Sequence, residues 1–322
     1  MTARLLRLLY LFGLLLVLTA VAIALSRAPD RPVHSLVARW APPPSTFIEV
    51  RGQLVHLRDV GPRADPAPLV LLHGTGASLH TWDGWEARLK ASKRVIRLDL
   101  PGFGLTGPFT GQYARDDYRG DTYARFVLDV LDALHVARAT IGGNSLGGEV
   151  AWRAATLAPE RFDKLILVDA SGYAFTPDEI PIGFRIARVP LLKRIGEHLL
   201  PRALVAASLR SVYGDPSRIS DELVDRYFEL TLREGNRRAL ALRLQQLESG
   251  EHAARIKTLA LPTLVLWGGR DRLVPPANAQ RFAADIRGAQ LVVFDDLGHL
   301  PHEEDPAHTV AAVAEFLQPR QP

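Results

Sequence analysis

Short apolar runs alternate with segments of helical periodicity along most of this chain. The runs are Leu69–Leu72, Val95–Leu98, Thr140–Ile141, Leu165–Val168, Leu264–Trp267 and Leu291–Phe294. Each is bounded by glycine, proline or aspartate, and nearly every position is apolar, which suits strands covered on both faces. The alternation therefore predicts an α/β fold with a doubly wound, mostly parallel sheet.

Two other segments complete the predicted domain plan. Residues 47–60 have the pattern of an antiparallel hairpin, and the proline-rich residues 28–46 before them are expected to form a stiff linker. Residues 173–254 contain no clear strand and have helical periodicity. Because the sheet pattern resumes afterwards, we predict a helical cap inserted into one core, made of residues 47–172 and 255–322.

The N-terminal residues 1–27 include a long uncharged segment, Leu8–Leu25. As a helix it would cover about 27 Å of a hydrocarbon core of roughly 30 Å. We expect a membrane anchor in contact with lipid, with Arg4 and Arg7 in the cytoplasm and the rest of the chain outside it, on the periplasmic or extracellular side. The alternative is a signal peptide cleaved near Ala22-Ile23-Ala24, which would release a secreted protein.

Composition excludes several classes of site and partner. The chain has no cysteine, so disulfides, thiolate nucleophiles and cysteine-ligated metals are ruled out. The 39 basic and 35 acidic residues are interspersed, which argues against binding to nucleic acid. No histidine pair with metal-ligand spacing and no phosphate-binding glycine loop is present. We therefore expect no metal and no cofactor.

A candidate nucleophile lies in Gly143-Asn144-Ser145-Leu146-Gly147, between a short strand and a helix. A Gly-x-Ser-x-Gly turn in this position lifts the serine hydroxyl above the sheet, and the flanking glycines relieve steric clashes. The N–H groups at the helix N-terminus then face developing negative charge. The alternative is a serine that only caps a helix in a glycine-rich turn.

A serine nucleophile needs a base and usually a carboxylate, and both follow later strands. Asp271 and His299 each come shortly after an apolar run, and the order Ser145, Asp271, His299 is that expected along a hydrolase sheet. His302 competes as the base but does not follow a strand as closely. Asp169, which closes an apolar run, competes as the acid. We favour Asp271 and His299.

Two backbone donors are expected to bind the oxyanion. The Leu146 N–H directly follows the nucleophile, and the Thr75 N–H belongs to the loop His73-Gly74-Thr75-Gly76. Glycines in that loop allow the backbone to approach a substrate closely. His73 is expected to be a structural hydrogen-bonding group.

Five motifs, taken together, resemble those of the α/β-hydrolase superfamily and span nearly all of residues 47–318. They are His73–Gly76, Asp99–Gly104, Gly143–Gly148, Gly268–Asp271 and Gly298-His299. The resemblance implies a Ser145–His299–Asp271 triad with Thr75 and Leu146 as oxyanion donors. It implies the serine-nucleophile branch, not the epoxide hydrolases or haloalkane dehalogenases, which use aspartate.

The leading functional interpretation is hydrolysis of small carboxylic esters through an acyl-enzyme, as in carboxylesterases and lipases (EC 3.1.1 class). The elbow is also similar to that of hydrolases that cleave carbon–carbon bonds in meta-cleavage products. Such diketone acids need a cation for their carboxylate, which the cap could supply from Arg185, Arg188 or Arg194. A catalytically silent, membrane-tethered binding or scaffold protein is a third interpretation, disfavoured because all triad positions are filled.

Overall fold

In the computed structural model, which describes residues 3–189 and 199–318, one sheet of eight strands forms the centre of the described chain. Its spatial order is β1-β2-β4-β3-β5-β6-β7-β8, and only the β1–β2 and β2–β4 pairs are antiparallel. The strands are β1 (Ser45–Val50), β2 (Gln53–Val60), β3 (Leu69–Leu72), β4 (Val95–Leu98), β5 (Ala139–Asn144), β6 (Phe162–Val168), β7 (Thr263–Gly268) and β8 (Gln290–Phe294). The mostly parallel sheet predicted from the alternation is confirmed.

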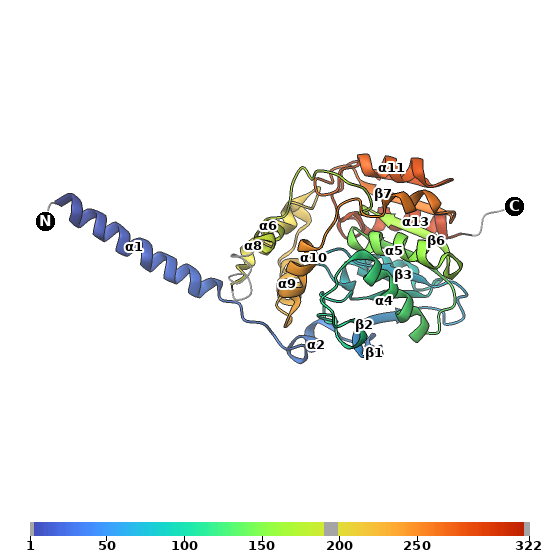
Figure 1. The fold of residues 1–322 in the computed structure, drawn as a ribbon, viewed down its shortest axis with the longest axis horizontal. Coiled ribbons are helices and arrows are strands. Elements are labelled where there is room, and N and C mark those ends of the chain that lie inside the picture. Colours follow the sequence, from blue (N-terminus) through green and yellow to red (C-terminus); the bar gives the residue numbers. More distant parts are fainter. Residues whose placement is uncertain (1–2, 190–198, 319–322) are drawn as a thin grey trace.

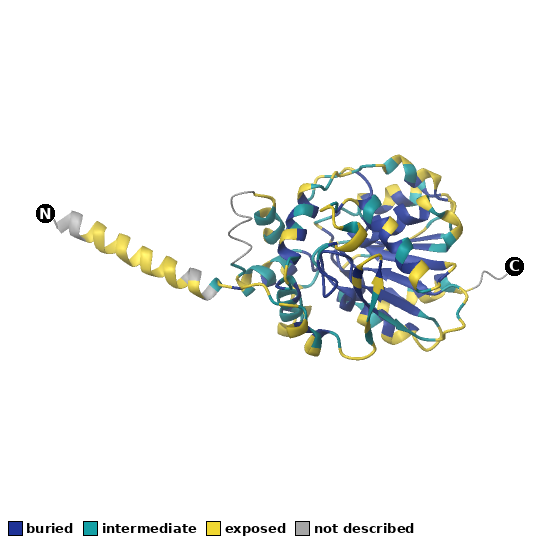
Figure 2. Ribbon diagram, turned by 60° about the horizontal axis from the view of Figure 1, so that its bottom comes forward, coloured by how far each residue is buried: buried dark blue, intermediate teal, exposed yellow. Residues whose placement is uncertain are grey.

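Helices cover both faces of the sheet because successive strand residues point to opposite sides. Val70 and Leu72 face the core beneath one set of helices, whereas Leu69 and Leu71 face the core beneath the other. The first set is α4 (Gly120–Ala133), α5 (Leu146–Leu157) and α11 (Ala277–Asp285), and the second is α3 (Asp83–Leu89) and α13 (Pro306–Leu317). Figure 2 shows the strands as the most deeply buried layer.

The last strand departs from the expected burial. We predicted Leu291–Phe294 as a strand covered on both faces, but β8 lies at the edge of the sheet. Leu291 and Val293 are about two-fifths exposed, at 39% and 40%. An apolar run alone does not distinguish an edge strand from a central one, because the difference depends on which strands pair.

The chain between β6 and β7 forms helices and no strand of the described sheet, within the range predicted for a cap. These cap helices are α6 (Ile182–Arg188), α8 (Arg202–Arg210), α9 (Asp221–Thr231) and α10 (Asn236–Gln245). They lie at one end of the sheet, between the core and the N-terminal helix (Figure 1). Tyr227 of α9 donates a hydrogen bond of 2.8 Å to Glu303 in α12 (Pro301–Glu304), which joins the cap helices to the core.

Helix α1 (Ala3–Ser26) projects away from the rest of the molecule (Figures 1 and 2). Its described apolar side chains are exposed, among them Leu11, Leu15 and Leu18. Across the residues that the structure describes, no helix combines the length and hydropathy that crossing a membrane requires. The membrane-spanning helix predicted here is therefore not confirmed.

The segment that we expected to be a stiff linker, residues 28–46, is not a free spacer. It contains α2 (His34–Trp40), in which Leu36 and Trp40 are buried. These two side chains are one helical turn apart and join Leu105 and Leu230 in a small apolar cluster. Asp30 accepts a hydrogen bond of 3.1 Å from Arg237 of α10. The segment therefore belongs to the folded domain.

This packing predicts the effect of truncating Leu36. Leu36→Ala should lower the free energy of unfolding by about 3 kcal/mol, because it removes buried methyl groups and leaves a cavity. The matched control is His34→Ala, at an exposed position of the same helix. Denaturant unfolding of the full-length chain measures both variants. Equal unfolding midpoints for the two would show that α2 contributes no core packing.

Candidate active site

Ser145 lies at the sharp turn between β5 and α5. Its backbone has φ +53° and ψ −113°, a conformation that residues with a side chain rarely adopt. Gly147 follows in the first turn of α5, where a Cβ atom would overlap the carbonyl of Leu72 on the neighbouring strand β3. The strained turn and the glycine together place Ser145 above the end of the sheet, as expected for a nucleophile elbow.

His299 and Asp271 are in direct contact. His299 Nδ1 lies 2.7 Å from Asp271 Oδ2, and both residues are buried. The other oxygen, Asp271 Oδ1, accepts hydrogen bonds from the N–H groups of Leu273 (2.8 Å) and Val274 (2.9 Å). When His299 is neutral and its Nδ1–H donates to Asp271, its Nε2 is free to accept a proton.

Ser145 and His299 line the same cavity. Within the described part of the chain, no hydrogen bond joins the Ser145 hydroxyl to the His299 ring. Such contacts are often long in proteins without substrate and tighten when a substrate binds. The structure therefore pairs Asp271 with His299 directly and places Ser145 at the wall of the cavity that His299 faces.

The predicted oxyanion donors, Thr75 and Leu146, line the same cavity as Ser145. Leu146 is the first residue of α5, so its N–H has no acceptor within the helix. Gly74, next to Thr75, lies directly against the elbow, and a Cβ atom there would be 2.7 Å from Asn144 Oδ1 and 3.2 Å from Ser145 Cβ. Thr75 and Leu146 both line the cavity, an arrangement that can stabilise negative charge on a substrate oxygen.

The structure gives His73 and His302 other contacts. His73 Nε2 accepts the Leu100 N–H at 2.9 Å, so its Nδ1–H donates to the Gly74 carbonyl, and burial lowers the pKa of His73. His302 contacts the Thr81 hydroxyl at 2.9 Å and stacks on Trp82. Burial holds the pKa of His302 well below its ordinary value. Neither ring is placed to act as the base for Ser145.

Two residues to which our sequence reasoning gave no role in the site hold the His299 loop. The Asn144 side chain donates to the His299 carbonyl at 2.9 Å, so the residue before Ser145 also holds the His299 loop. Glu304 accepts the N–H of Gly298 at 2.9 Å and that of Gly214, next to the cap helices, at 3.0 Å. The motif that contains Asn144 gave no hint of this contact, and Glu304 carried no sequence signal.

Asp169, the competing acid, lies at the end of β6 and does not take the place of Asp271 at His299. Ligating atoms of Asp169, Asp271 and His299 lie within 4.8 Å of one another, a spacing that a metal ion could use. However, both oxygens of Asp271 already accept hydrogen bonds, from two N–H groups and the His299 ring. We therefore interpret the cluster as the surroundings of the hydrogen-bonded Asp271–His299 pair and not as a set of metal ligands.

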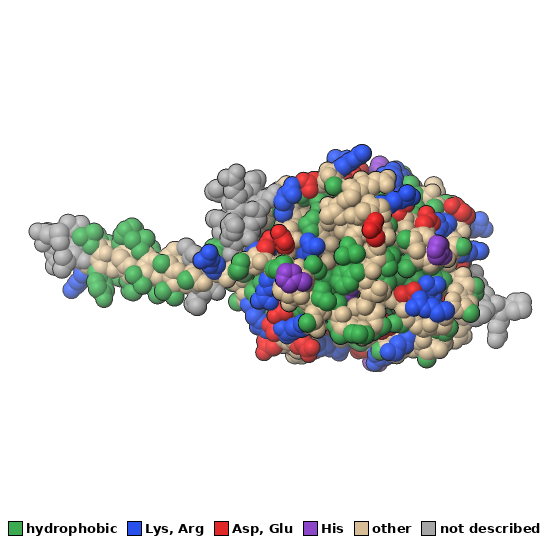
Figure 3. Space-filling view, turned by 90° about the horizontal axis from the view of Figure 1, so that it is seen from below, with side chains coloured by type: hydrophobic (Ala, Val, Ile, Leu, Met, Phe, Trp, Pro, Cys, Tyr) green, Lys and Arg blue, Asp and Glu red, His purple; other side chains and the backbone are tan. Residues whose placement is uncertain are grey.

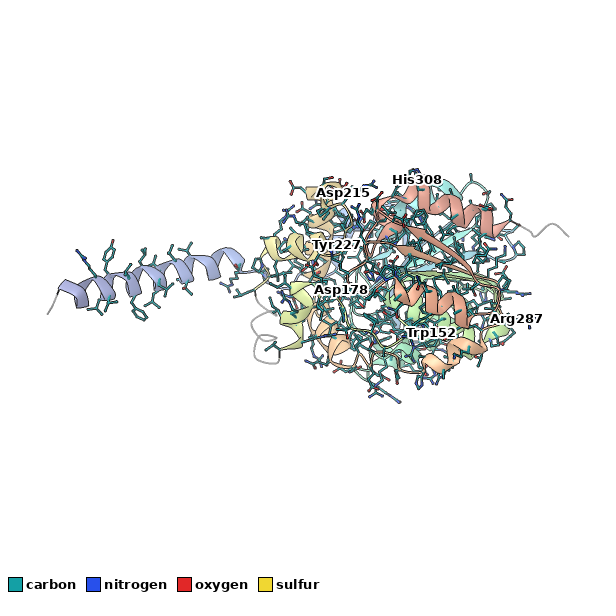
Figure 4. All side chains as sticks on the ribbon, turned by 90° about the horizontal axis from the view of Figure 1, so that it is seen from above. Trp152, Asp178, Asp215, Tyr227, Arg287 and His308 are labelled. Atoms are coloured by element: carbon teal, nitrogen blue, oxygen red, sulfur yellow. The ribbon has the colours of Figure 1, made fainter. Side chains whose placement is uncertain are left out.

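The cavity, of about 250 Å³, lies between the elbow and the cap helices. Apolar side chains dominate its cap side, for example Ile180, Phe184, Leu204, Leu209, Leu240 and Leu244. Tyr227, which also lines it, lies on the side of the globular part that faces α1 in Figure 4. The site can therefore enclose an apolar group next to a nucleophilic hydroxyl.

Comparison with known proteins agrees with this geometry. The family model described as alpha/beta hydrolase fold matches residues 67–306. The chain belongs to the α/β-hydrolase family. This hydrolase is 30% identical to the 2-hydroxymuconate semialdehyde hydrolase of Pseudomonas sp. (strain CF600) over 260 residues, which cover 78% of the chain and 86% of that protein.

Two solved structures resemble the hydrolase closely in fold. A meta-cleavage product hydrolase from Pseudomonas fluorescens IP01 is 28% identical, with a TM-score of 0.72, and the match covers 84% of this chain and 96% of that one. A thermophilic esterase from Thermogutta terrifontis is 25% identical, with a TM-score of 0.69, over 84% of this chain and 98% of that one. The similar proteins thus include both carbon–carbon hydrolases and esterases.

The His299–Asp271 contact predicts the effect of Asp271→Asn. The amide cannot hold the histidine in the required tautomer or stabilise its charged form, so Ser145 should react with a fluorophosphonate about a thousandfold more slowly. Asp296→Asn, an exposed aspartate in a nearby loop, serves as the control and should react at the wild-type rate. A wild-type labelling rate in Asp271→Asn would show that Asp271 does not assist the reaction of Ser145.

Proposed function

We propose that this hydrolase cleaves carboxylic esters through an acyl-enzyme formed on Ser145. The observation that carries the proposal is the buried contact of 2.7 Å between His299 and Asp271, next to an elbow serine in an apolar cavity. A serine hydroxyl becomes a competent nucleophile only when an oriented base removes its proton. The three side chains supply that combination.

In the proposed mechanism, His299 Nε2 takes the proton of Ser145 as Oγ attacks the ester carbonyl. The N–H groups of Leu146 and Thr75 stabilise the resulting oxyanion. His299 then gives the proton to the departing alcohol oxygen, and the C–O bond breaks to leave the acyl-enzyme. Water, deprotonated by His299, releases the acid and restores Ser145.

The charges around the cavity favour an uncharged substrate. Of the arginines that line it, Arg243 pairs with Glu149 at 2.7 Å, and Arg237 donates to Asp30. At these two arginines a substrate carboxylate would compete with existing carboxylate partners. The third lining arginine, Arg188, is exposed and has no ion pair among the described residues. An uncharged acyl chain in the apolar part of the cavity needs no positively charged side chain as a partner.

Carbon–carbon cleavage of a diketone acid is the second candidate, favoured by the resemblance to the 2-hydroxymuconate semialdehyde hydrolase and to the meta-cleavage product hydrolase. Of the cations that we predicted for a substrate carboxylate, Arg188 lines the cavity and Arg185 is exposed outside its lining. Arg194 lies outside the described residues. Arg188 is therefore the residue on which this second candidate depends.

Labelling and turnover test the proposed function. The full-length chain should react with a fluorophosphonate probe, Ser145→Ala should not, and Ser92→Ala should react normally. Wild-type protein should also hydrolyse p-nitrophenyl esters, with a rate that falls when the acyl chain exceeds the cavity. Labelling with turnover of diketone acids alone would favour carbon–carbon cleavage, and no labelling of folded protein would favour a binding or scaffold role.

We further propose that the hydrolase works at a lipid surface outside the cytoplasm, with α1 in contact with lipid. The proposal is supported by the exposed apolar side chains that surround the described part of α1 (Figure 3). Leaving these side chains in water is unfavourable, and insertion among acyl chains removes that cost.

Flotation with liposomes tests this contact. Wild-type protein should float with the vesicles, whereas the triple variant Leu11→Glu, Leu15→Glu, Leu18→Glu should remain in the dense fraction. Leu54→Glu, at an exposed leucine of the domain, should float like wild type.

Protease accessibility tests the side of the membrane on which the domain lies. In intact spheroplasts, added protease should degrade the domain. Equal flotation of the triple variant or protection from protease would contradict the respective part of the proposal.

A further inference from the structure

Asp169 is buried beside the triad and lacks a complete set of hydrogen-bond partners. Its side chain is fully buried at the end of β6, where its backbone φ is +45°. Asp169 Oδ1 accepts the N–H of Gly268 at 2.9 Å, whereas Oδ2 has no partner in the described part of the structure. Its carboxylate lies within 4.8 Å of ligating atoms of Asp271 and His299.

Two carboxyl groups so close together in a buried site cannot both be ionised without a large energetic cost. The surrounding donors decide which of them keeps the charge. Asp271 accepts from Leu273, Val274 and His299, whereas Asp169 accepts from one N–H group alone among the described residues. The negative charge is therefore best placed on Asp271.

The other groups that face Asp169 act in the same direction. Burial first, and then the charge of Asp271, raise the pKa of Asp169 well above its ordinary value, with a smaller contribution from the charge of Glu304. The hydrogen bond from the Gly268 N–H acts in the opposite direction but does not outweigh them. The titratable group His299 contacts Asp271 directly, and its ligating atom also lies within 4.8 Å of the Asp169 carboxylate. A proton on Asp169 Oδ2 would give a hydrogen-bonding role to the carboxyl oxygen that otherwise has no partner among the described residues.

We propose that Asp169 is a positioning residue that remains a neutral acid and donates a hydrogen bond from Oδ2 to the Asp271 carboxylate. The bond fixes the orientation of Asp271 and withdraws part of its charge from His299. Asp169 thereby sets how strongly Asp271 stabilises the charged imidazole, without touching the substrate.

Two substitutions separate a neutral donor from an ionised group. In Asp169→Asn the amide N–H₂ can donate to Asp271 and the amide oxygen can accept from Gly268, so both hydrogen bonds survive. Asp169→Leu removes both. The readout is the pH–rate profile of fluorophosphonate labelling, measured on the full-length chain. The acidic limb of this profile, where the rate falls as the pH is lowered, reports the protonation of His299. Asp163→Asn, an aspartate of the same strand, is the control.

The neutral-donor role predicts that Asp169→Asn labels within about threefold of the wild-type rate, with the acidic limb at the same pH. Asp169→Leu should label about tenfold more slowly. Its acidic limb should move to higher pH, because an Asp271 carboxylate without that donor stabilises the protonated form of His299 more strongly. A purely structural loss would slow labelling without moving the limb.

An ionised Asp169 predicts a different result, which would overturn the proposal. Replacing a carboxylate by a neutral amide would then lower the pKa of His299 and move the acidic limb of Asp169→Asn to lower pH. Infrared difference spectra provide a second readout that does not need activity. A protonated carboxyl band at neutral pH, present in wild type and absent from Asp169→Asn, is expected, and its absence from wild type would refute the neutral acid.

Failure of the proposed function would be distinguishable from failure of this inference. Protein that is not labelled at all, yet shows the protonated carboxyl band, would contradict the serine-hydrolase function and leave the state of Asp169 as proposed. Protein that is labelled but lacks the protonated carboxyl band would support the serine-hydrolase function and contradict the neutral state of Asp169.

Discussion

The buried hydrogen bond between His299 and Asp271 depends on loops that follow three different strands. Asp271 is held by N–H groups of its own loop, and the His299 carbonyl is held by Asn144 of the elbow. The parallel order of β5, β6, β7 and β8 brings these loops to the same end of the sheet. In open α/β sheets this end is where ligands bind, because the loops after the strands converge there.

The cap helices contact the loop that carries His299 as well as the cavity. The His299 N–H donates to the Val212 carbonyl at 2.8 Å, and Glu304 bridges Gly298 and Gly214. Tyr227 reaches Glu303 in the same short helix. A change in the position of the cap helices would therefore move the His299 loop. The shape of the cavity and the orientation of the His299 ring thus depend on the same contacts.

These contacts continue to the N-terminal segment. The Trp40 indole donates to Glu229 of α9 at 2.7 Å, and Asp30 holds Arg237 of α10. Residues 28–40 thus lie against the helices that carry Tyr227 and the apolar wall of the cavity. The segment that follows α1 is part of the same packed unit as the cap helices, and it fixes where α1 ends relative to the site.

The sequence by itself determined the strands, the elbow and the Asp271–His299 pair. Apolar runs, glycine turns and the residues just after strands are local patterns that can be recognised in the sequence. Because the carboxyl ends of parallel strands meet at one edge of the sheet, residues that follow different strands come together there. Tertiary structure alone decided the edge position of β8, the packing of α2 and the contacts of Asn144, Glu304 and Asp169. Each of these depends on contacts between residues distant in the chain, as when Asn144 meets His299, and no local pattern encodes them.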